Sequence, residues 1–279
     1  MPSYRLLIEY DGTRFAGWQV QASGRTVQGV LLDALRRVLG QAEIDLQGAG
    51  RTDAGVHALG QVASLRCRAA FAPESALAAL ERALPPDVAV LDLQPTARGF
   101  HARHDAVARA YRYQIAQRRS AFGKRSTWWV AQELDVAAMA QAAQVFCGRH
   151  DFRAFARRAG EADATLVEVE SMDVRRVGEL VLLRLVASHF LWNQVRRMVA
   201  ALVAIGLRAE APDAVGAWLS GAAQPPAGSA PAAGLFLEAV RYPGEIWSLP
   251  ELTPVGVPWQ RHTLAQGTRD MLGFKKGRK

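Results

Sequence analysis

The sequence predicts an α+β protein built from two ferredoxin-like halves. Three observations support this prediction. Segments with strand-like and helix-like patterns follow one another in the order β-α-β-β-α-β, the same order occurs a second time, and half of the 279 residues are apolar, which suffices to bury a core. We expect the halves to span residues 1–105 and 106–248, followed by an irregular basic tail over residues 249–279.

The first half contains four predicted strands and two predicted helices. From Tyr4 to Tyr10, every second residue is apolar or aromatic and would lie on one face, and the segment ends in Asp11-Gly12-Thr13. This pattern is typical of a strand that enters a turn. Apolar residues at helical spacing follow between a capping residue, Thr26, and a terminating Gly40. The remaining predicted elements are strands over 44–47, 60–67 and 88–93, and a helix over 73–84.

The second half repeats this order, although no residue-by-residue repeat is visible. Apolar residues from Leu191 to Ile205 stripe a long helix and leave Arg196 at the border of its apolar face. Tyr111 and Tyr113 share one face of the first strand. The predicted elements are strands over 110–116, 166–177, 180–187 and 235–242, and helices over 136–146, 191–205 and 212–219.

The composition indicates a partner and excludes several kinds of protein. With 34 basic and 26 acidic residues the chain has a net charge of +8 and a pI near 10.1, so nucleic acid is the first partner to consider, a merely basic surface being the alternative. Two distant cysteines, Cys67 and Cys147, exclude a thiolate zinc site and are expected to be reduced. Without an apolar leader or a run of about 20 apolar residues, we expect a cytoplasmic protein and no membrane partner.

A glycine-bracketed turn carries the residues best suited to chemistry. It reads Gly48-Ala49-Gly50-Arg51-Thr52-Asp53-Ala54-Gly55-Val56-His57, joins two predicted strands, and leaves room for a flat ligand. It is no Walker A loop, because Val56 follows Gly55, and no Rossmann fingerprint, because Asp53 stands where a glycine is required. A tight turn in which Asp53 caps its own backbone explains the spacing equally well.

Four blocks of sequence carry a resemblance to a known family. One block is the turn from Gly50 to His57. The others are Glu9-Tyr10-Asp11-Gly12-Thr13 with Gly17-Trp18-Gln19 and Gln21, Phe100-His101-Ala102-Arg103 with Arg109-Ala110-Tyr111-Arg112-Tyr113, and Phe190-Leu191 through Val195-Arg196-Arg197 with Gly234-Leu235. Together they resemble the tRNA pseudouridine synthase A family. The chain departs from the family pattern at Trp192-Asn193-Gln194, where histidine-rich sequence is expected, and after about residue 249.

This resemblance implies a tRNA pseudouridine(38–40) synthase, an isomerase that converts uridine to pseudouridine at positions 38, 39 and 40 of the tRNA anticodon stem-loop. It also implies the pseudouridine synthase fold, in which two ferredoxin-like halves form a mixed or antiparallel sheet flanked by helices, with the catalytic cleft between the halves. The expected enzyme is a cytoplasmic homodimer that binds tRNA and uses no cofactor and no metal.

The same resemblance implies roles for individual residues. Asp53 is expected to be catalytic, with Arg196 as the cation that keeps the carboxylate charged and Tyr111 stacked on the uracil. Arg51 would assist the flipping of the nucleotide, and Leu235 would form an apolar wall of the pocket. Each role has an ordinary alternative: a helix-flank arginine in solvent, a core aromatic, a salt bridge within the turn, or plain strand core.

The start of the second half is rich in arginine. RNA stems hide their base edges in a deep, narrow groove, so an enzyme that acts on a stem should recognise shape and phosphates through basic side chains. We therefore expect Arg103, Arg109 and Arg112 to bind RNA, although an individual surface arginine is more often solvated. His57 is expected to be a structural hydrogen-bonding residue, and Tyr113 to fill core space.

The chemistry is compatible with a single acid in the turn. The isomerisation breaks the N1–C1′ bond, rotates the uracil and joins C5 to C1′ without hydrolytic water, so one carboxylate can suffice where glycoside hydrolysis uses two. Asp53 can act as a nucleophile or as a base that removes a sugar proton, and the sequence leaves both open. The rival is a non-catalytic RNA-binding protein with paired RRM-like halves, which would gain nothing from an acid there. The motifs of zinc deaminases, His-x-Glu and Pro-Cys-x-x-Cys, are absent from the sequence.

Overall fold

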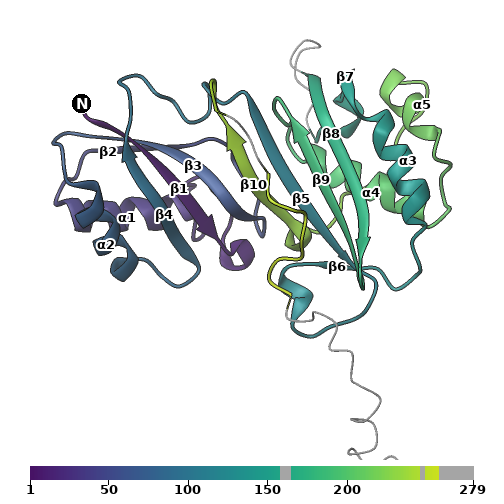
Figure 1. The fold of residues 1–279 in the computed structure, drawn as a ribbon, viewed down its shortest axis with the longest axis horizontal. Helices are drawn as coiled ribbons and strands as arrows, with labels where there is room; N and C mark the ends of the chain where they lie inside the picture. The colour runs from purple at the N-terminus through teal and green to yellow at the C-terminus, as the bar shows by residue number, and fades with distance from the viewer. Residues whose placement is uncertain (158–164, 246–248, 258–279) are drawn as a thin grey trace, which may run out of the picture.

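Ten strands form one long sheet with five α-helices packed on it (Figure 1). The computed structural model describes residues 1–157, 165–245 and 249–257, and these counts refer to that part of the chain. The sheet order is β4-β1-β3-β10-β5-β9-β8-β7, with β2 paired to β3 and β6 to β5. The strands are β1 (Ser3–Tyr10), β2 (Ile44–Gly48), β3 (His57–Cys67), β4 (Val88–Pro95), β5 (Ala108–Ala116), β6 (Trp128–Trp129), β7 (Gly148–Asp151), β8 (Leu166–Val177), β9 (Leu180–Ala187) and β10 (Leu235–Arg241). The helices are α1 (Val27–Leu39), α2 (Pro73–Ala83), α3 (Val136–Val145), α4 (Gln194–Gly206) and α5 (Ala214–Ser220).

Each half of the sheet has the strand order of a ferredoxin-like fold. The first half runs β4-β1-β3-β2 and the second runs β10-β5-β9-β8, so the predicted β-α-β-β-α-β order is confirmed in both. Pairing within each of these four-stranded units is antiparallel. The halves join where β10 runs parallel to the start of β3, with Phe236 opposite His57 and Leu237 opposite Ala58. The predicted mixed sheet is therefore confirmed.

The first helix ends at its predicted capping residues, whereas helix α4 begins later than predicted. The hydroxyl of Thr26 accepts a hydrogen bond from the first turn of α1, and Gly40 ends that helix with a φ of 62°. Helix α4 begins at Gln194 rather than at Leu191, because Asn193 has a φ of 66°, outside the helical range. The sequence does not predict β6 and β7, since strands this short show no alternation.

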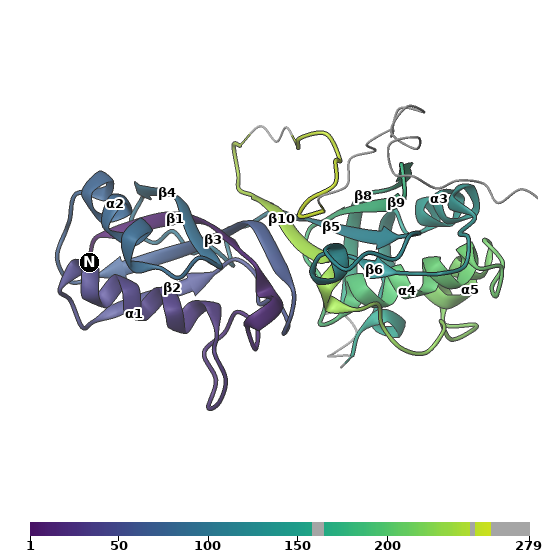
Figure 2. The ribbon, with the colours of Figure 1, turned by 90° about the horizontal axis from the view of Figure 1, so that it is seen from below.

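Each half has its own hydrophobic core, and seen from below the halves form two lobes (Figure 2). Strand β10 contributes to both cores, with Leu235 in the core of the second half and Leu237 in the core of the first. Tyr111 on β5 packs against both cores, so its side chain lies at their junction. The sheet runs on through this junction, and the boundary between residues 105 and 106 stays a prediction.

A buried ion cluster joins β5, β9 and β10. Glu238 accepts hydrogen bonds from Arg112 and Arg184, and the three side chains are 3%, 4% and 11% exposed. Burial alone would raise the pKa of Glu238, but Arg184 and Arg112 hold it below its usual range. Because side chains alternate along a strand, Arg112 lies on the face of β5 opposite Tyr111. This paired, enclosed position does not fit the predicted contact between Arg112 and RNA.

Residues 249–257, here called the C-terminal strap, cover the ion cluster. The strap contains no helix or strand and is bound to the sheet. Arg112 donates to the carbonyl of Thr253 at 2.9 Å, and Gln114 exchanges two hydrogen bonds of 2.8 Å with the backbone of Val255. Leu252 is 4% exposed. The basic tip of the tail, predicted to be disordered, lies outside the described residues.

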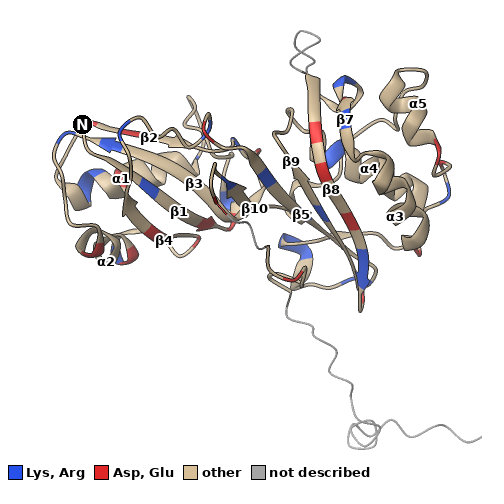
Figure 3. Ribbon diagram, turned by 45° about the horizontal axis from the view of Figure 1, so that its top comes forward, with Lys and Arg blue, Asp and Glu red and all other residues tan. Residues whose placement is uncertain are grey.

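Positive charge is distributed over both halves (Figure 3). Residues of either half can therefore contribute to a site for an anionic partner. Cys67 is buried, Cys147 is half-buried, and both thiols are free, as expected. Within the described ranges, no helix combines the length and the apolar character needed to cross a membrane.

Candidate active site

The turn between β2 and β3 is held by side chains from the core of the first half. The fully buried Gln61 accepts a hydrogen bond from the N–H of Gly50 at 3.3 Å and donates one to its carbonyl at 2.8 Å. The hydroxyls of Tyr10 and Thr52 share a hydrogen bond of 2.8 Å. These contacts fix the backbone that immediately precedes Asp53.

Two glycines let neighbouring backbone close around the turn. Gly55 has a φ of 79°, a left-handed conformation that glycine adopts without strain. Gly17 has a φ of 112°, and a Cβ on it would lie 2.8 Å from the carbonyl oxygen of Thr52. The backbone N–H of the next residue, Trp18, donates to the same carbonyl oxygen at 3.0 Å. A side chain at position 17 would prevent this close approach, so the loop needs a glycine there.

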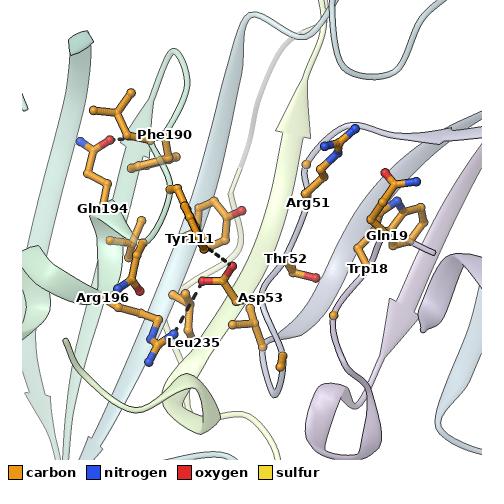
Figure 4. Close-up of a pocket in the computed structure, with 18 of the residues that line it drawn as sticks. Trp18, Gln19, Arg51, Thr52, Asp53, Tyr111, Phe190, Gln194, Arg196 and Leu235 are labelled. Carbon is orange, nitrogen blue, oxygen red and sulfur yellow. Dashed lines mark hydrogen bonds and ion pairs between the residues drawn. The ribbon is translucent and has the colours of Figure 1, made fainter. Parts of the chain in front are cut away.

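The carboxylate of Asp53 points across the cleft to the second half (Figure 4). Its Oδ1 accepts a hydrogen bond from Nε1 of Trp192 at 3.1 Å, and its Oδ2 lies 3.6 Å from Nη1 of Arg196. The side chain remains 31% exposed. In the part of the chain that is described, no backbone N–H donates to this carboxylate, so the alternative of a self-capping turn does not hold.

Arg196 is directed at Asp53 by the loop that precedes β10. Its Nε donates to the carbonyl of Ala230 at 2.6 Å, and its Nη2 donates to the hydroxyl of Ser229 at 3.3 Å. The side chain is 20% exposed, so Arg196 is not a helix-flank arginine in open solvent. A cation at this distance attracts the carboxylate and offsets its negative charge.

Tyr111 and Leu235 form an apolar wall beside Asp53. The ring of Tyr111 meets that of Phe190 edge to face, with 5.1 Å between centroids, and Leu235 is 5% exposed at the cleft. Burial raises the pKa of Tyr111 to about 12, an effect that Arg109 opposes and Asp53 adds to. The phenol is therefore protonated at neutral pH, and it can donate a hydrogen bond but is a weak base.

These side chains line a cleft of about 870 Å³ between the two halves, as the predicted fold requires. Of the described residues that line it, one is a carboxylate, Asp53, and five are arginines: Arg51, Arg103, Arg109, Arg157 and Arg196. Such a lining attracts a polyanion and presents a single acid to it. Across the described ranges, no three His, Cys, Asp or Glu side chains gather in a way that could hold a metal ion.

The predicted arginines of the cleft differ in their freedom. Arg51 is exposed, and no hydrogen bond or ion pair joins it to another described residue, so the alternative of a salt bridge within the turn does not hold. Arg103 is also exposed. Arg109 is 9% exposed. It donates to the backbone carbonyls of Ala49, Arg103, Ala106 and Ser188. Arg109 thus supplies fixed positive charge, whereas Arg51 and Arg103 can move to meet a ligand.

Two residues near the turn have structural roles, as predicted. Nδ1 of His57 accepts a hydrogen bond from the N–H of Gly12 at 3.1 Å, and Nε2 lies 3.2 Å from the carbonyl oxygen of Ala233. Burial lowers the pKa of His57, so the ring is neutral at pH 7. Tyr113 is fully buried and donates to the carbonyl of Pro231 at 2.7 Å.

Two residues of the site are not predicted from the sequence. Trp192 donates to Asp53, and the guanidinium of Arg157 lies over the ring of Trp192, 4.7 Å from its centroid. The one available signal for Trp192 is its place in the segment that departs from the family pattern. Nothing in the sequence connects Arg157 with the turn.

Comparison with known proteins gives a consistent result over most of the chain. A family model described as tRNA pseudouridine synthase matches residues 6–105 and 142–243. A tRNA pseudouridine synthase A of Moorella thermoacetica is 43% identical over 247 residues, covering 87% of this chain and 100% of that protein. Its counterpart in Azorhizobium caulinodans is 44% identical over 252 residues, covering 88% of this chain and 96% of that protein.

Similarity to solved structures is weaker. A crystal structure of the archaeal box H/ACA Nop10–Cbf5 complex matches with a TM-score of 0.33 and 10% identity, over 72% of this chain and 44% of that chain. A superposition of this quality carries no argument about the site.

Proposed function

The chain belongs to the tRNA pseudouridine synthase family, and on this premise we propose that it isomerises uridine to pseudouridine at positions 38, 39 and 40 of the tRNA anticodon stem-loop, with Asp53 as its catalytic residue. Membership of the family makes the protein an isomerase that forms pseudouridine. The rival description, a non-catalytic RNA-binding protein with paired RRM-like halves, is thereby set aside.

One observation carries the proposed role of Asp53. It is the single carboxylate among the described residues that line a cleft with five arginines, and its Oδ2 lies 3.6 Å from Arg196. The arginines suit a phosphate backbone, and the acid suits a reaction at the sugar. A protein that only bound RNA would be weakened by a negative charge at this point.

The reaction breaks the N1–C1′ bond of uridine and joins C5 to C1′ after the uracil has rotated. C5 then loses its proton to solvent and N1 gains one, so the product is an isomer and a C5 tritium label is released. Asp53 can attack C1′ as a nucleophile, or it can remove a sugar proton as a base, and its partly exposed carboxylate supports both. Arg196 offsets the charge of the carboxylate in either case. Tyr111 and Leu235 would hold the detached uracil, the ring of Tyr111 by stacking and Leu235 as an apolar wall.

A uridine in a paired stem has to leave the stack before C1′ can reach Asp53, which costs a few kcal/mol. Arg51 is exposed at the rim of the cleft and is free to occupy the gap that the nucleotide leaves. Arg103 and Arg109 would bind neighbouring phosphates, Arg103 as a mobile cation and Arg109 as a fixed one. Recognition of shape and phosphates would permit modification of several adjacent uridines.

We expect the enzyme to act on tRNA as a homodimer in the cytoplasm, without a cofactor or metal. These expectations come from the family resemblance and not from contacts within the chain. Light scattering of the purified protein would test the dimer. Activity in the presence of a chelator would test the absence of a metal requirement.

The central experiment measures tritium release from C5-labelled uridine in tRNA. The Asp53→Asn variant is expected to lose at least about 10³-fold in rate, because no other described residue that lines the cleft is an acid. Asp33→Asn, which alters an exposed carboxylate on α1, is the matched control and should keep the parent rate. Unchanged release by Asp53→Asn would overturn the assignment.

A second experiment tests the position of the target. tRNA transcripts that keep uridine at only one of positions 38, 39 and 40 are incubated with the protein, and modified nucleosides are mapped by mass. Pseudouridine is expected at each of the three positions. Pseudouridine confined to another part of the tRNA would contradict the anticodon assignment while leaving the isomerase activity intact.

A further inference from the structure

The two oxygens of the Asp53 carboxylate have different environments. Oδ1 accepts the hydrogen bond from Nε1 of Trp192 at 3.1 Å, whereas Oδ2 faces Arg196 at 3.6 Å, too far for a hydrogen bond. An oxygen that accepts a hydrogen bond is a weaker nucleophile and a weaker base than one that does not, because the bond occupies one of its lone pairs. The carboxylate is therefore asymmetric before any substrate binds.

We propose that Trp192 is a positioning residue for Asp53, whose indole N–H holds Oδ1 and leaves Oδ2 as the oxygen that reacts with the sugar. This inference rests on the proposed catalytic role of Asp53. A terminal carboxylate rotates through a broad, nearly two-fold torsion, so a single fixed donor suffices to select one orientation. The selected orientation also keeps Oδ2 next to Arg196.

One contact holds the indole ring of Trp192, and three features hold the backbone that carries it. The guanidinium of Arg157 lies over the ring, 4.7 Å from its centroid, and the backbone N–H of Arg157 donates to the carbonyl of Trp192 at 3.0 Å. Asn193 has a φ of 66° and turns the chain sharply into α4. The side chain of Gln194 accepts a hydrogen bond from the N–H of Leu191 at 2.8 Å, which closes that turn. A side chain held this way can act as a fixed donor although it is 44% exposed.

The test replaces the indole while keeping an aromatic ring. In Trp192→Phe the ring over Arg157 is retained and the N–H is lost. At saturating tRNA the single-turnover rate is expected to fall about tenfold, which corresponds to about 1.4 kcal/mol of transition-state stabilisation. The Kd for tRNA should change by less than about twofold, since the phosphate contacts are untouched.

Two further variants make the result specific. Trp129→Phe alters a tryptophan of similar exposure, 46%, outside the cleft, and should keep the parent rate and Kd. Trp192→His restores an N–H donor on a smaller ring and should recover part of the lost rate. A merely structural role for Trp192 would lower the unfolding temperature of Trp192→Phe, and a restored N–H donor would then not recover the rate.

Several results would overturn the proposal. An unchanged or faster single turnover in Trp192→Phe would mean that the indole only blocks Asp53 and leaves when RNA binds. A higher Kd for tRNA with an unchanged single-turnover rate would make Trp192 an RNA contact instead. If Asp53→Asn is inactive while Trp192→Phe equals the parent, this inference alone fails. If Asp53→Asn retains activity, the proposed function fails and the inference is overturned with it.

Discussion

Asp53 and Glu238 are both carboxylates paired with arginine near the junction of the two halves, but they differ in how completely they are paired. Glu238 is 3% exposed and accepts hydrogen bonds from two guanidinium groups, those of Arg112 and Arg184. Asp53 is 31% exposed and has one indole donor and one arginine at 3.6 Å. One carboxylate is enclosed and saturated, and the other is accessible and partly unsatisfied.

This difference separates a structural ion pair from the ion pair to which we assign the reaction. A buried carboxylate whose two oxygens both accept hydrogen bonds from arginine is not accessible to a substrate, and removal of its charge leaves its partners buried without compensation. A partly satisfied carboxylate at a cleft keeps a reactive oxygen and contributes little to stability. Substitutions at the two sites should therefore separate stability from activity.

The largest expected effect on stability is at Glu238. Glu238→Gln removes the charge that compensates Arg112 and Arg184, both of which are nearly enclosed. We expect the free energy of unfolding to fall by about 3–5 kcal/mol, as for other broken buried pairs. Urea denaturation followed by circular dichroism measures the change.

Activity provides the control for this prediction. The folded fraction of Glu238→Gln should release tritium at a rate close to that of the parent protein, because Glu238 lies outside the cleft. A loss of rate as large as that of Asp53→Asn, at full folding, would erase the distinction between the two carboxylates.

The next effect is at Arg196, where activity and not stability should change. Arg196→Lys keeps the charge, but a lysine has no planar fork with which to bind Ala230 and face Asp53 at once. We expect the turnover number to fall about 100-fold, as misplacement of a charged group by about 1 Å can cause. Arg197→Lys is the matched neighbour: Arg197 donates to the carbonyl of Ala154, and its variant should keep most of the rate. Equal rates for the two variants would contradict the role of Arg196.

A smaller effect is expected from removal of the C-terminal strap. A chain that ends at residue 248 lacks the carbonyl acceptors of Arg112 and Arg184 and the buried side chain of Leu252. Relative to a chain that ends at residue 257, its free energy of unfolding should fall by about 2 kcal/mol, roughly the value of one buried leucine. Identical urea midpoints for the two chains would show that the strap does not stabilise the ion cluster.

The smallest effect concerns pH. The pKa of Glu238 in the folded protein lies below the ordinary value of 4.5, so its contribution to stability is fully present above about pH 4.5. The contribution is lost as the pH falls further, through the folded-state pKa. The stability difference between the parent and Glu238→Gln should therefore be constant from pH 6 to 8 and should shrink below pH 4.5. A difference that grows on acidification would contradict the cause assigned to the shift.

Much of the fold could be predicted because it depends on local signals. Alternating apolar and polar residues mark the central strands. Thr26 and Gly40 mark the two ends of the first helix, and the turn at Gly178 joins β8 to β9. The start of α4 could not be predicted, because a positive φ at Asn193 leaves no periodic signal. The strands β6 and β7 could not be predicted either, because strands this short show no alternation of apolar and polar residues.

Only those residues of the candidate site that belong to a recognised sequence motif could be predicted. Asp53, Arg196 and Tyr111 come from the family resemblance, and their mutual geometry depends on packing between halves. Arg112 shows why basic residues mislead: the carboxylate that pairs with it lies 126 residues away in the chain, so its burial has no local signal. The hydrogen bond from Trp192 to Asp53 likewise spans 139 residues.

Strand β10 has a consequence for how the enzyme is made. Among the strands of the described residues it is the last to leave the ribosome, yet it occupies the middle of the sheet, between β3 and β5. Leu235 and the Ser229–Ala230 anchor of Arg196 arrive with it or just before it. A nascent chain thus carries Asp53 early but no assembled cleft, and catalytic competence appears in one late step. Translation products that end before β10 should accordingly form no pseudouridine in RNA.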